Sequence, residues 1–304
     1  MAVERFATTG AAPDHFAPEE VALHARDVQF DFSNSPLCWI EGDPYGSHFI
    51  SSLNLLLPTG ERWFCANFTE AMGYVKDERL REEMIGFMGQ EAVHAKSHDK
   101  ALPEFLRRHG IDAEPFVDQV EWLFGRISER LETVYPAPSR GAAEVSVEII
   151  AGLEHFFAAL GNWVLNNNWD EMGVDPVIKD LFRWHGAEEV EHRHVAYNVA
   201  GYFRKGYLRH MVASVVAAAV LLMLVARGTK FLVHNDPSLP NLGYFRLMWK
   251  IRKSGKRGSI PTIRFLFVTM LRLFKPNYSP EAEGNTAQAI AYLATSPAAR
   301  EING

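Results

Sequence analysis

Cysteines, targeting signals and nucleotide-binding loops are scarce or missing in this 304-residue sequence. Its two cysteines, Cys38 and Cys65, form no C-x-x-C pair, so neither a disulfide scaffold nor a thiolate zinc site is expected. No basic stretch followed by an apolar run opens the chain, which predicts a cytoplasmic protein. Glycine-rich phosphate loops and the G-x-S-x-G nucleophile motif are also missing, so we expect no bound nucleotide and expect any hydrolysis to depend on a metal.

Alternating apolar and polar residues, the pattern of strands, are rare, whereas apolar residues recur at helical spacing almost throughout. The sequence therefore predicts an all-α protein, and its 47% hydrophobic residues suffice for a packed core. Three parts are expected: an irregular N-terminal segment over residues 1–46, a metal-binding helical bundle over 47–203, and basic, apolar C-terminal helices over 204–304 packed on the bundle.

The ends of the predicted helices are set by proline, glycine and capping residues. Pro58 removes an amide donor and crowds the preceding turn, so a break is predicted there, and Pro103 should kink or divide its helix. Asp77 and Asp175 suit helix N-caps. The expected ranges are 47–57, 61–75, 77–109, 115–134, 139–169 and 176–203.

Charge is distributed unevenly along the chain. The first 202 residues carry 16 Lys and Arg against 33 Asp and Glu. Residues 203–275 carry 14 Lys and Arg against a single acidic residue, Asp236. An acidic body followed by a basic, apolar segment predicts two parts with different partners.

The stretches QEAVHAKSH (90–98) and HGAEEVEHRH (185–194) each contain a Glu-x-x-His motif inside a predicted helix. Residues three apart on a helix project to the same side, so the Glu and the His of one motif can bind one cation. The preceding helix supplies one further glutamate, 30 residues upstream of the first motif and 35 upstream of the second. The pattern therefore occurs twice, and its members are Glu61, Glu91 and His94, followed by Glu154, Glu189 and His192.

Two helices with one Glu each and two with Glu-x-x-His form the ligand set of ferritin-like four-helix bundles. Six ligands, four of them anionic, suit two divalent metal ions, with iron expected first and manganese or zinc as alternatives. Glu154 stands among apolar residues, where a buried carboxylate would be costly unless it were paired or coordinated. Either charged run taken alone would more often be a solvated helix face.

Two acidic neighbours of the second motif are candidates for further roles. Glu188 lies close enough in helical phase to His192 to replace Glu189 as the ligand, although the spacing of the first motif favours Glu189. Glu188 and Glu191 are also the candidate general bases of the site.

Two histidines extend the symmetry of the motifs. His98 lies seven residues after Glu91, and His185 lies seven residues before His192. Each is therefore either a further metal ligand or a hydrogen-bond partner of a ligating carboxylate. His155 points away from its neighbour Glu154 and is interpreted as structural.

Four stretches together resemble the ferritin-like proteins known as predicted metal-dependent hydrolases. They are residues 38–64, 89–98, 184–199 and 273–280, so the resemblance covers most of the chain. It implies a metal site in the core of a helical bundle. That family usually ends in a variant of R-P-G-F-H-P, whereas residues 275–280 here contain no histidine.

The metal site leaves three functions open. A Glu/His helical bundle also resembles di-iron oxygenases and oxidases, so the first expectation is an O2-dependent oxidoreductase that acts on a hydrophobic substrate with electrons from a separate donor protein. The alternative is a hydrolase in which a metal-bound water is the nucleophile and Glu188 or Glu191 is the base. A metal-binding or storage protein is the third candidate.

The basic segment bears on the partners. Residues 211–226 are an uncharged run of 16 residues, shorter than the roughly 20 that span a bilayer, so a buried helix is favoured. Residues 244–275 mix aromatic and aliphatic side chains with Arg and Lys, which is typical of a helix on an anionic membrane surface. We expect peripheral contact with the inner face of the membrane, a lipid-like substrate, a homodimer and no nucleic acid partner.

Overall fold

The computed structural model describes residues 22–136, 138–203, 206–275 and 277–301, and every regular element within these ranges is a helix. Ile40 and Val174 form one isolated antiparallel bridge. The prediction of an all-α protein is therefore confirmed. Residues 1–21 of the predicted irregular segment lie outside the described residues.

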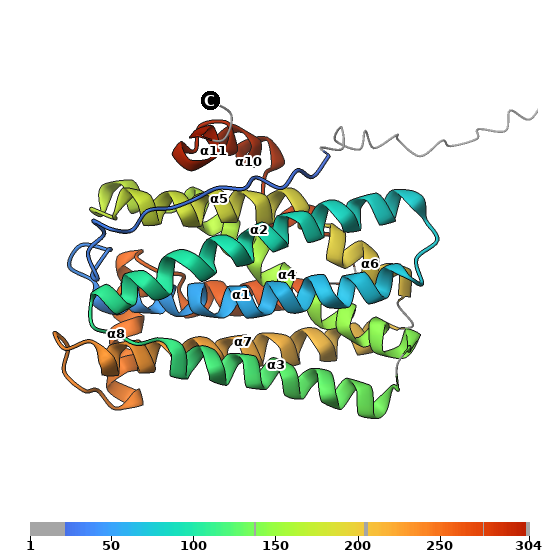
Figure 1. Ribbon diagram of the computed structural model, residues 1–304, viewed down its shortest axis with the longest axis horizontal. Coiled ribbons are helices and arrows are strands. Elements are labelled where there is room, and N and C mark those ends of the chain that lie inside the picture. Colours follow the sequence, from blue (N-terminus) through green and yellow to red (C-terminus); the bar gives the residue numbers. More distant parts are fainter. Residues whose placement is uncertain (1–21, 137, 204–205, 276, 302–304) are drawn as a thin grey trace, which may run out of the picture.

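Four long helices carry the predicted ligands: α1 (Pro44–Met72), α2 (Glu78–Arg108), α4 (Arg140–Asn166) and α5 (Pro176–His192). α1 packs against α2 and α4, and α5 packs against α4 and α2, which encloses a common core (Figure 1). Each helix begins at a residue whose side chain accepts a hydrogen bond from an amide of the first turn. These N-caps are Asp43, Asp77, Ser139 and Asp175.

Two further long helices, α3 (Glu114–Val134) and α7 (Tyr207–Asn235), run beside the ligand helices (Figure 1). α7 packs along α1 and α4, and a buried polar pair fixes each of its ends. Near its start His210 Nδ1 lies 2.6 Å from Glu148 Oε2, and just after its end Asp236 Oδ2 lies 2.8 Å from His48 Nε2. The one acidic residue of the basic segment therefore serves to attach that segment to α1.

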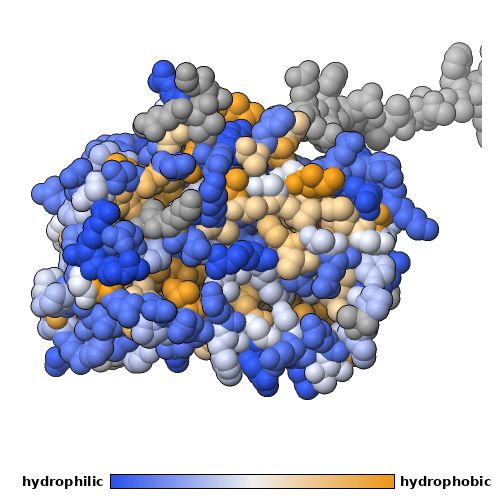
Figure 2. Space-filling view, viewed as in Figure 1, coloured by the Kyte–Doolittle hydropathy of each residue, from blue (hydrophilic) through white to orange (hydrophobic). Residues whose placement is uncertain are grey.

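The remaining helices are short and lie at the ends or the outside of the bundle. α8 (Tyr244–Arg257) packs against α1, α9 (Ile263–Leu273) contacts α4 and α7, and α10 (Thr286–Leu293) and α11 (Pro297–Glu301) pack on α5. Hydrophilic side chains cover most of the face on which α1 and α2 lie, with hydrophobic groups between them (Figure 2). The other short elements are α6 (Val195–Phe203) and the 3-10 turns Trp169–Glu171 and Pro280–Glu283.

One helix in the described ranges, α7, is long and apolar enough to cross a membrane. Only 33% of its most apolar stretch is buried within the protein. One face of α7 therefore packs on the bundle, and the other face exposes apolar side chains such as Leu208, Val212 and Val216.

The interruption predicted at Pro58 is wrong, because α1 continues through this residue. α2 is not divided at Pro103, and the kink predicted there as the alternative stays a prediction. A proline inside a helix costs about 3 kcal/mol in a lost hydrogen bond and a steric clash. Around Pro58 the helix buries consecutive residues against its neighbours, among them Leu55, Leu56 and Leu57, and this packing outweighs the local cost.

The helix predicted over 176–203 is instead broken into α5 and α6 by a turn at Arg193 and His194. The buried Arg193 guanidinium donates a hydrogen bond to the carbonyl of Val190 and pairs with Glu281. The Val190 carbonyl therefore accepts a hydrogen bond from a side chain, in place of the backbone amide that a continuous helix would supply. The chain turns directly after the last predicted ligand, His192.

Residues 22–43, which we call the N-terminal strap, contain no helix and lie along α2 and α5 (Figure 1). Ser97 donates a hydrogen bond to the Val28 carbonyl at 3.3 Å, and Gln90 donates one to the His24 carbonyl at 3.3 Å. The strap thus crosses the outer side of the two helices that carry the Glu-x-x-His motifs.

Candidate metal centre

The four ligand helices bring all six residues of the repeated Glu, Glu-x-x-His pattern into the core, and none of the six is more than 2% exposed. Each helix contributes side chains from its inward face. On α2 and α5 the Glu and the His of one motif share that face, because residues three apart project to the same side. The contributors are Glu61 from α1, Glu91 and His94 from α2, Glu154 from α4, and Glu189 and His192 from α5.

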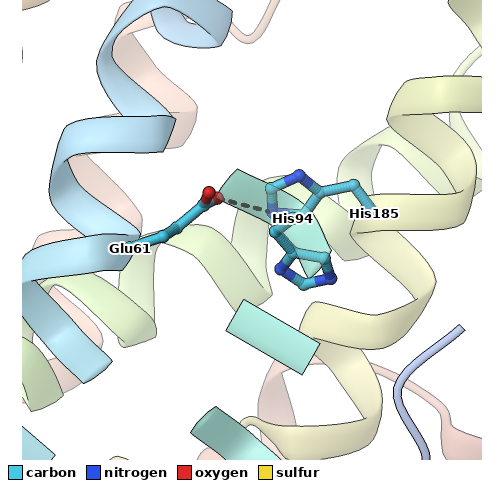
Figure 3. A group of neighbouring side chains, drawn as sticks. All are labelled: Glu61, His94 and His185. Carbon is cyan, nitrogen blue, oxygen red and sulfur yellow. Dashed lines mark ion pairs between the residues drawn. The ribbon is translucent and has the colours of Figure 1, made fainter. Parts of the chain in front are cut away.

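The donor atoms form two adjacent groups, and within each group they lie within 4.8 Å of one another. The first group is rich in histidine and contains Glu61, His94 and His185 (Figure 3). In that view Glu61 projects from α1 toward the imidazoles of α2 and α5, and its Oε1 lies 3.7 Å from His185 Nε2. The second group is rich in carboxylates and contains Glu91, Glu154, Glu189 and His192.

Glu189 connects the two groups. Its Oε1 lies 2.7 Å from His185 Nε2 and 3.7 Å from His94 Nδ1, both in the histidine-rich group. Its Oε2 lies 3.2 Å from His192 Nε2, in the carboxylate-rich group. One carboxylate can therefore contact cations held in both groups.

Seven buried donor atoms at this centre have no hydrogen-bond partner among the described residues. They are both carboxylate oxygens of Glu61, Glu91 and Glu154, and Nδ1 of His94. Buried ionisable groups are costly without a partner, and cations held in the two groups would satisfy these atoms. A donor set of carboxylates and imidazoles fits divalent metals of intermediate hardness, so the residues present fit a metal centre.

The pKa values of the glutamates at this centre depend on their burial and on the charges of their neighbours. Burial, followed by the charges of neighbouring glutamates, raises the pKa of Glu61 and Glu91 well above the usual range. Burial and Glu189 raise the pKa of Glu154 to about 7. Burial acts in the same direction on Glu189, but His192 and His185 hold its pKa below the usual range. A bound cation would have to displace protons from several of these groups.

Hydrogen bonds outside the two groups fix the tautomers of both motif histidines. The carboxylate of Glu188 accepts from His94 Nε2 at 2.9 Å, which leaves Nδ1 of His94 facing the centre. The amide oxygen of Gln90 accepts from His192 Nδ1 at 3.0 Å, which leaves Nε2 of His192 facing the centre. Such outer partners orient ligating histidines and increase their basicity.

The outer partners are themselves held by Arg26 of the N-terminal strap. Its guanidinium donates to Glu188 Oε1 at 2.6 Å and to the two oxygens of Glu191 at 2.9 and 3.2 Å. Gln90 also donates to Glu191 at 3.0 Å. Arg26, Glu188, Glu191 and Gln90 thus form one network behind the two motifs.

The structure distinguishes between Glu188 and Glu189, which the sequence left as alternative metal ligands. It places Glu189 among the grouped donors and Glu188 outside both groups, with His94 between Glu188 and the centre. Glu191 is farther out, behind Gln90 and Arg26. The catalytic role of Glu188 and Glu191 stays a prediction.

The two additional histidines also differ from each other. His185 belongs to the histidine-rich group, whereas His98 belongs to neither group. His98 Nε2 lies 2.5 Å from His185 Nδ1, and its Nδ1 contacts the side-chain oxygen of Asn54. His98 therefore lies behind His185 as its hydrogen-bond partner. His155 contacts the Tyr278 hydroxyl and the Thr269 carbonyl, away from the donor groups, in keeping with a structural role.

Arg26 and Gln90 were missed in the sequence. Gln90 directly precedes the ligand Glu91, and an amide at that place could have been recognised as a partner for a ligating histidine. Arg26 has no local signal, because the strap forms no periodic element and its partners are about 160 residues away.

One family model matches the chain, over residues 24–284, and it describes a predicted metal-dependent hydrolase. The chain belongs to this family. The match covers every grouped donor as well as Arg26, so the family resemblance found in the sequence is confirmed. No curated protein and no solved structure matches the chain.

Proposed function

We propose that this family member is a metal-dependent hydrolase whose two divalent cations are held between α1, α2, α4 and α5. The observation that supports the proposal is the convergence of seven buried donor atoms without a hydrogen-bond partner from three helices, next to the imidazoles of a fourth. Family membership favours hydrolysis over the O2-dependent oxidation that the sequence led us to expect first.

The two donor groups support an assignment of ligands to each cation. Glu61, His94 and His185 would hold one, and Glu91, Glu154 and His192 would hold the other, with Glu189 shared between them. Bound divalent cations supply Lewis acidity, which polarises the bond to be cleaved and lowers the pKa of a coordinated water.

The residues of the chain itself would position the ligands and move protons. Burial raises the pKa of Glu188 to about 7, although the Arg26 guanidinium opposes this shift. A carboxyl group with such a pKa exchanges its proton near neutral pH, which suits a general base or acid. Its bond to His94 connects it to the centre, so Glu188 is the stronger candidate of the two predicted bases.

Oxidation of a hydrophobic substrate at a di-iron centre is the second candidate. It is favoured by the four carboxylates of the centre, of which Glu91 and Glu189 lie near histidines of both groups. Iron, manganese and zinc all accept such donors, so the donor set is compatible with either chemistry. Oxidation would also require a separate electron-donor protein.

Metal analysis of paired variants tests the proposal. Protein purified without added metal should contain close to two divalent cations per chain by elemental mass spectrometry. A Glu91→Gln, Glu154→Gln double variant should lose the cation of the carboxylate-rich group, and a matched exposed variant, Glu121→Gln, should keep both cations. Full metal content in the double variant would refute the site.

Reloading the metal-free protein separates the two chemistries. With zinc or manganese, hydrolysis of ester and phosphoester panels should return, whereas the iron-loaded protein should consume no O2 with reductant and substrate. Rapid O2 consumption by the iron form, with no hydrolysis in any form, would establish the second candidate instead.

A further inference from the structure

An apolar pocket lies between α1, α4 and α5 and ends at the metal centre. Leu53 and Leu57 line it from α1, Phe157 and Leu160 from α4, and His185 and Glu189 from α5. The two α5 residues are the only ionisable side chains in its lining, and both belong to the centre or connect its halves. The other side chains of the lining are aliphatic, aromatic or proline.

The pocket wall is fixed by a close crossing of α4 and α5. A side chain at Gly161 could not be accommodated, because its Cβ would lie 2.4 Å from the Gly186 carbonyl oxygen. Gly186 directly follows His185 and precedes Glu189 by three residues. The backbone contact between the two glycines therefore holds both metal-centre residues at the pocket wall.

The dimensions and lining of the pocket indicate what it can take. Its volume is about 60 Å³, whereas an apolar cavity of about 150 Å³ is known to bind benzene. A short, unbranched aliphatic chain fits such a space, whereas a ring system or a long chain does not. Its lining offers a polar group no hydrogen-bond partner until the group reaches His185 and Glu189.

A second cavity near the centre is larger and different in character. It has a volume of about 690 Å³ and is lined by charged side chains including Glu83, Arg193 and Glu281. It reaches Glu191 and not the grouped donors, because Gln90 and Arg26 lie between Glu191 and the centre. The apolar pocket is thus the one whose lining includes residues of the centre itself.

We propose that the apolar pocket binds the unbranched hydrocarbon chain of the substrate and places the adjoining polar group at His185 and Glu189. The inference rests on the proposed function, since it assigns a substrate class to the same metal centre. Substrates would be esters or similar molecules with one short, linear apolar chain beside the reactive group.

Quenching of Trp163, which lines the pocket, provides a test that does not depend on activity. A terminally brominated short-chain acid, 4-bromobutyrate, should quench tryptophan fluorescence in a saturable manner, and Trp163→Phe should remove most of the quenching. Leu160→Phe, which narrows the pocket, should weaken binding at least about tenfold. Ile85→Phe, at the charged cavity, should leave binding unchanged.

The outcomes distinguish this inference from the proposed function. Absence of saturable quenching, or equal quenching in Leu160→Phe, would overturn the pocket assignment even if two metals and hydrolysis are found. Loss of binding in Ile85→Phe alone would assign the chain to the charged cavity and also overturn it. Failure of the proposed function would show separately, as missing metal in a protein that still binds the brominated chain.

A second inference comes from α8, which exposes an aromatic stripe flanked by cations. Phe245, Met248 and Trp249 are exposed, with Phe245 at 89%, while Leu247 and Ile251 on the opposite side are buried. Lys253 Nζ lies 3.7 Å from the centre of the Trp249 ring. α8 contains no acidic residue, and its cations are Arg246, Lys250, Arg252, Lys253, Lys256 and Arg257.

We infer that α8 binds the surface of an anionic lipid bilayer. Aromatic side chains suit the boundary between head groups and acyl chains, and the surrounding Lys and Arg complement anionic head groups. The buried face of α8 is already occupied by its packing on α1, so the exposed stripe is available to the membrane.

Sedimentation with vesicles tests this contact. The protein should pellet with phosphatidylcholine vesicles that contain phosphatidylglycerol and not with pure phosphatidylcholine, and high salt should release it. A Phe245→Ser, Trp249→Ser variant should stay in solution, while Trp122→Ser, which removes an exposed aromatic of α3, should still pellet. Equal sedimentation of wild type and the double variant would overturn the inference. So would a concentration-dependent dimer, measured by light scattering, that the double variant abolishes, because a second copy would then be the occupant.

Discussion

The two halves of the metal centre arise from nearly identical sequence motifs but differ in composition and surroundings. The histidine-rich group has two imidazoles and one carboxylate, borders the apolar pocket, and is supported by His98 and Asn54. The carboxylate-rich group has three carboxylates and one imidazole, and Gln90 lies behind it. A repeated motif has therefore produced two unequal donor groups, which reach the apolar pocket through different side chains, His185 from one group and Glu189 from the other.

This inequality suggests a division of roles. Carboxylates neutralise the charge of a cation more fully than imidazoles do, so the carboxylate-rich group is suited to holding its cation firmly. The cation of the histidine-rich group would keep more of its positive charge. Each of the following predictions tests whether the two halves are distinct.

The largest effect is expected at the residue that joins the halves. Glu189→Gln should remove both cations, because the two oxygens of Glu189 face different groups and an amide is a much poorer ligand. Elemental analysis should find close to zero metal per chain, with the helical circular dichroism of the wild type retained. If one cation remained, Glu189 would belong to a single half.

Variants at the glutamates that belong to a single donor group should remove one cation each. Glu61→Gln should empty the histidine-rich group, and Glu154→Gln should empty the carboxylate-rich group, because each contributes to only one of them. Metal content should fall from two to one in both cases. Substitution with Co²⁺ would show which half remains, since the two halves have different imidazole content and should give different absorption spectra.

Smaller effects are expected from the residues behind each half. Gln90→Leu removes the acceptor that fixes His192, and His98→Phe removes the partner of His185. Loss of such partners typically weakens metal binding by about 10–100-fold. Competition with a chromophoric chelator should show Gln90→Leu weakening one site and His98→Phe the other. Equal effects of both variants on both sites would mean that the halves act as one unit.

The smallest effect is a pH dependence of stability in the metal-free protein. Burial raises the pKa of Glu154 to about 7, above its ordinary value of 4.5. A raised folded-state pKa gives stability that is complete below the unfolded pKa and is lost as pH rises through the folded value. The Tm of chelator-treated protein should therefore fall between pH 5 and pH 8. In the metal-loaded protein the cations replace the protons, so the Tm should fall less. A parallel decline in both forms would contradict this explanation.

The sequence predicted the grouped donors more reliably than it predicted the helix boundaries. Glu91 with His94, and Glu189 with His192, could be recognised because helical spacing fixes their mutual orientation whatever the rest of the fold does. The interruption predicted at Pro58 was wrong. The sequence shows the local cost of a proline in a helix, but not the burial of the neighbouring residues that outweighs this cost. The break at Arg193 was missed, because its partner Glu281 lies far along the chain.

The sequence by itself determined the helical class, the periodic placement of six acidic and imidazole side chains, and the division into an acidic body and a basic segment. These properties follow from local spacing and composition. Only the tertiary structure decided that Glu189 joins two groups, that His98 lies behind His185, and that Arg26 holds Glu188 and Glu191. Those relations depend on how separate helices and the N-terminal strap pack against one another, and no local pattern specifies that packing.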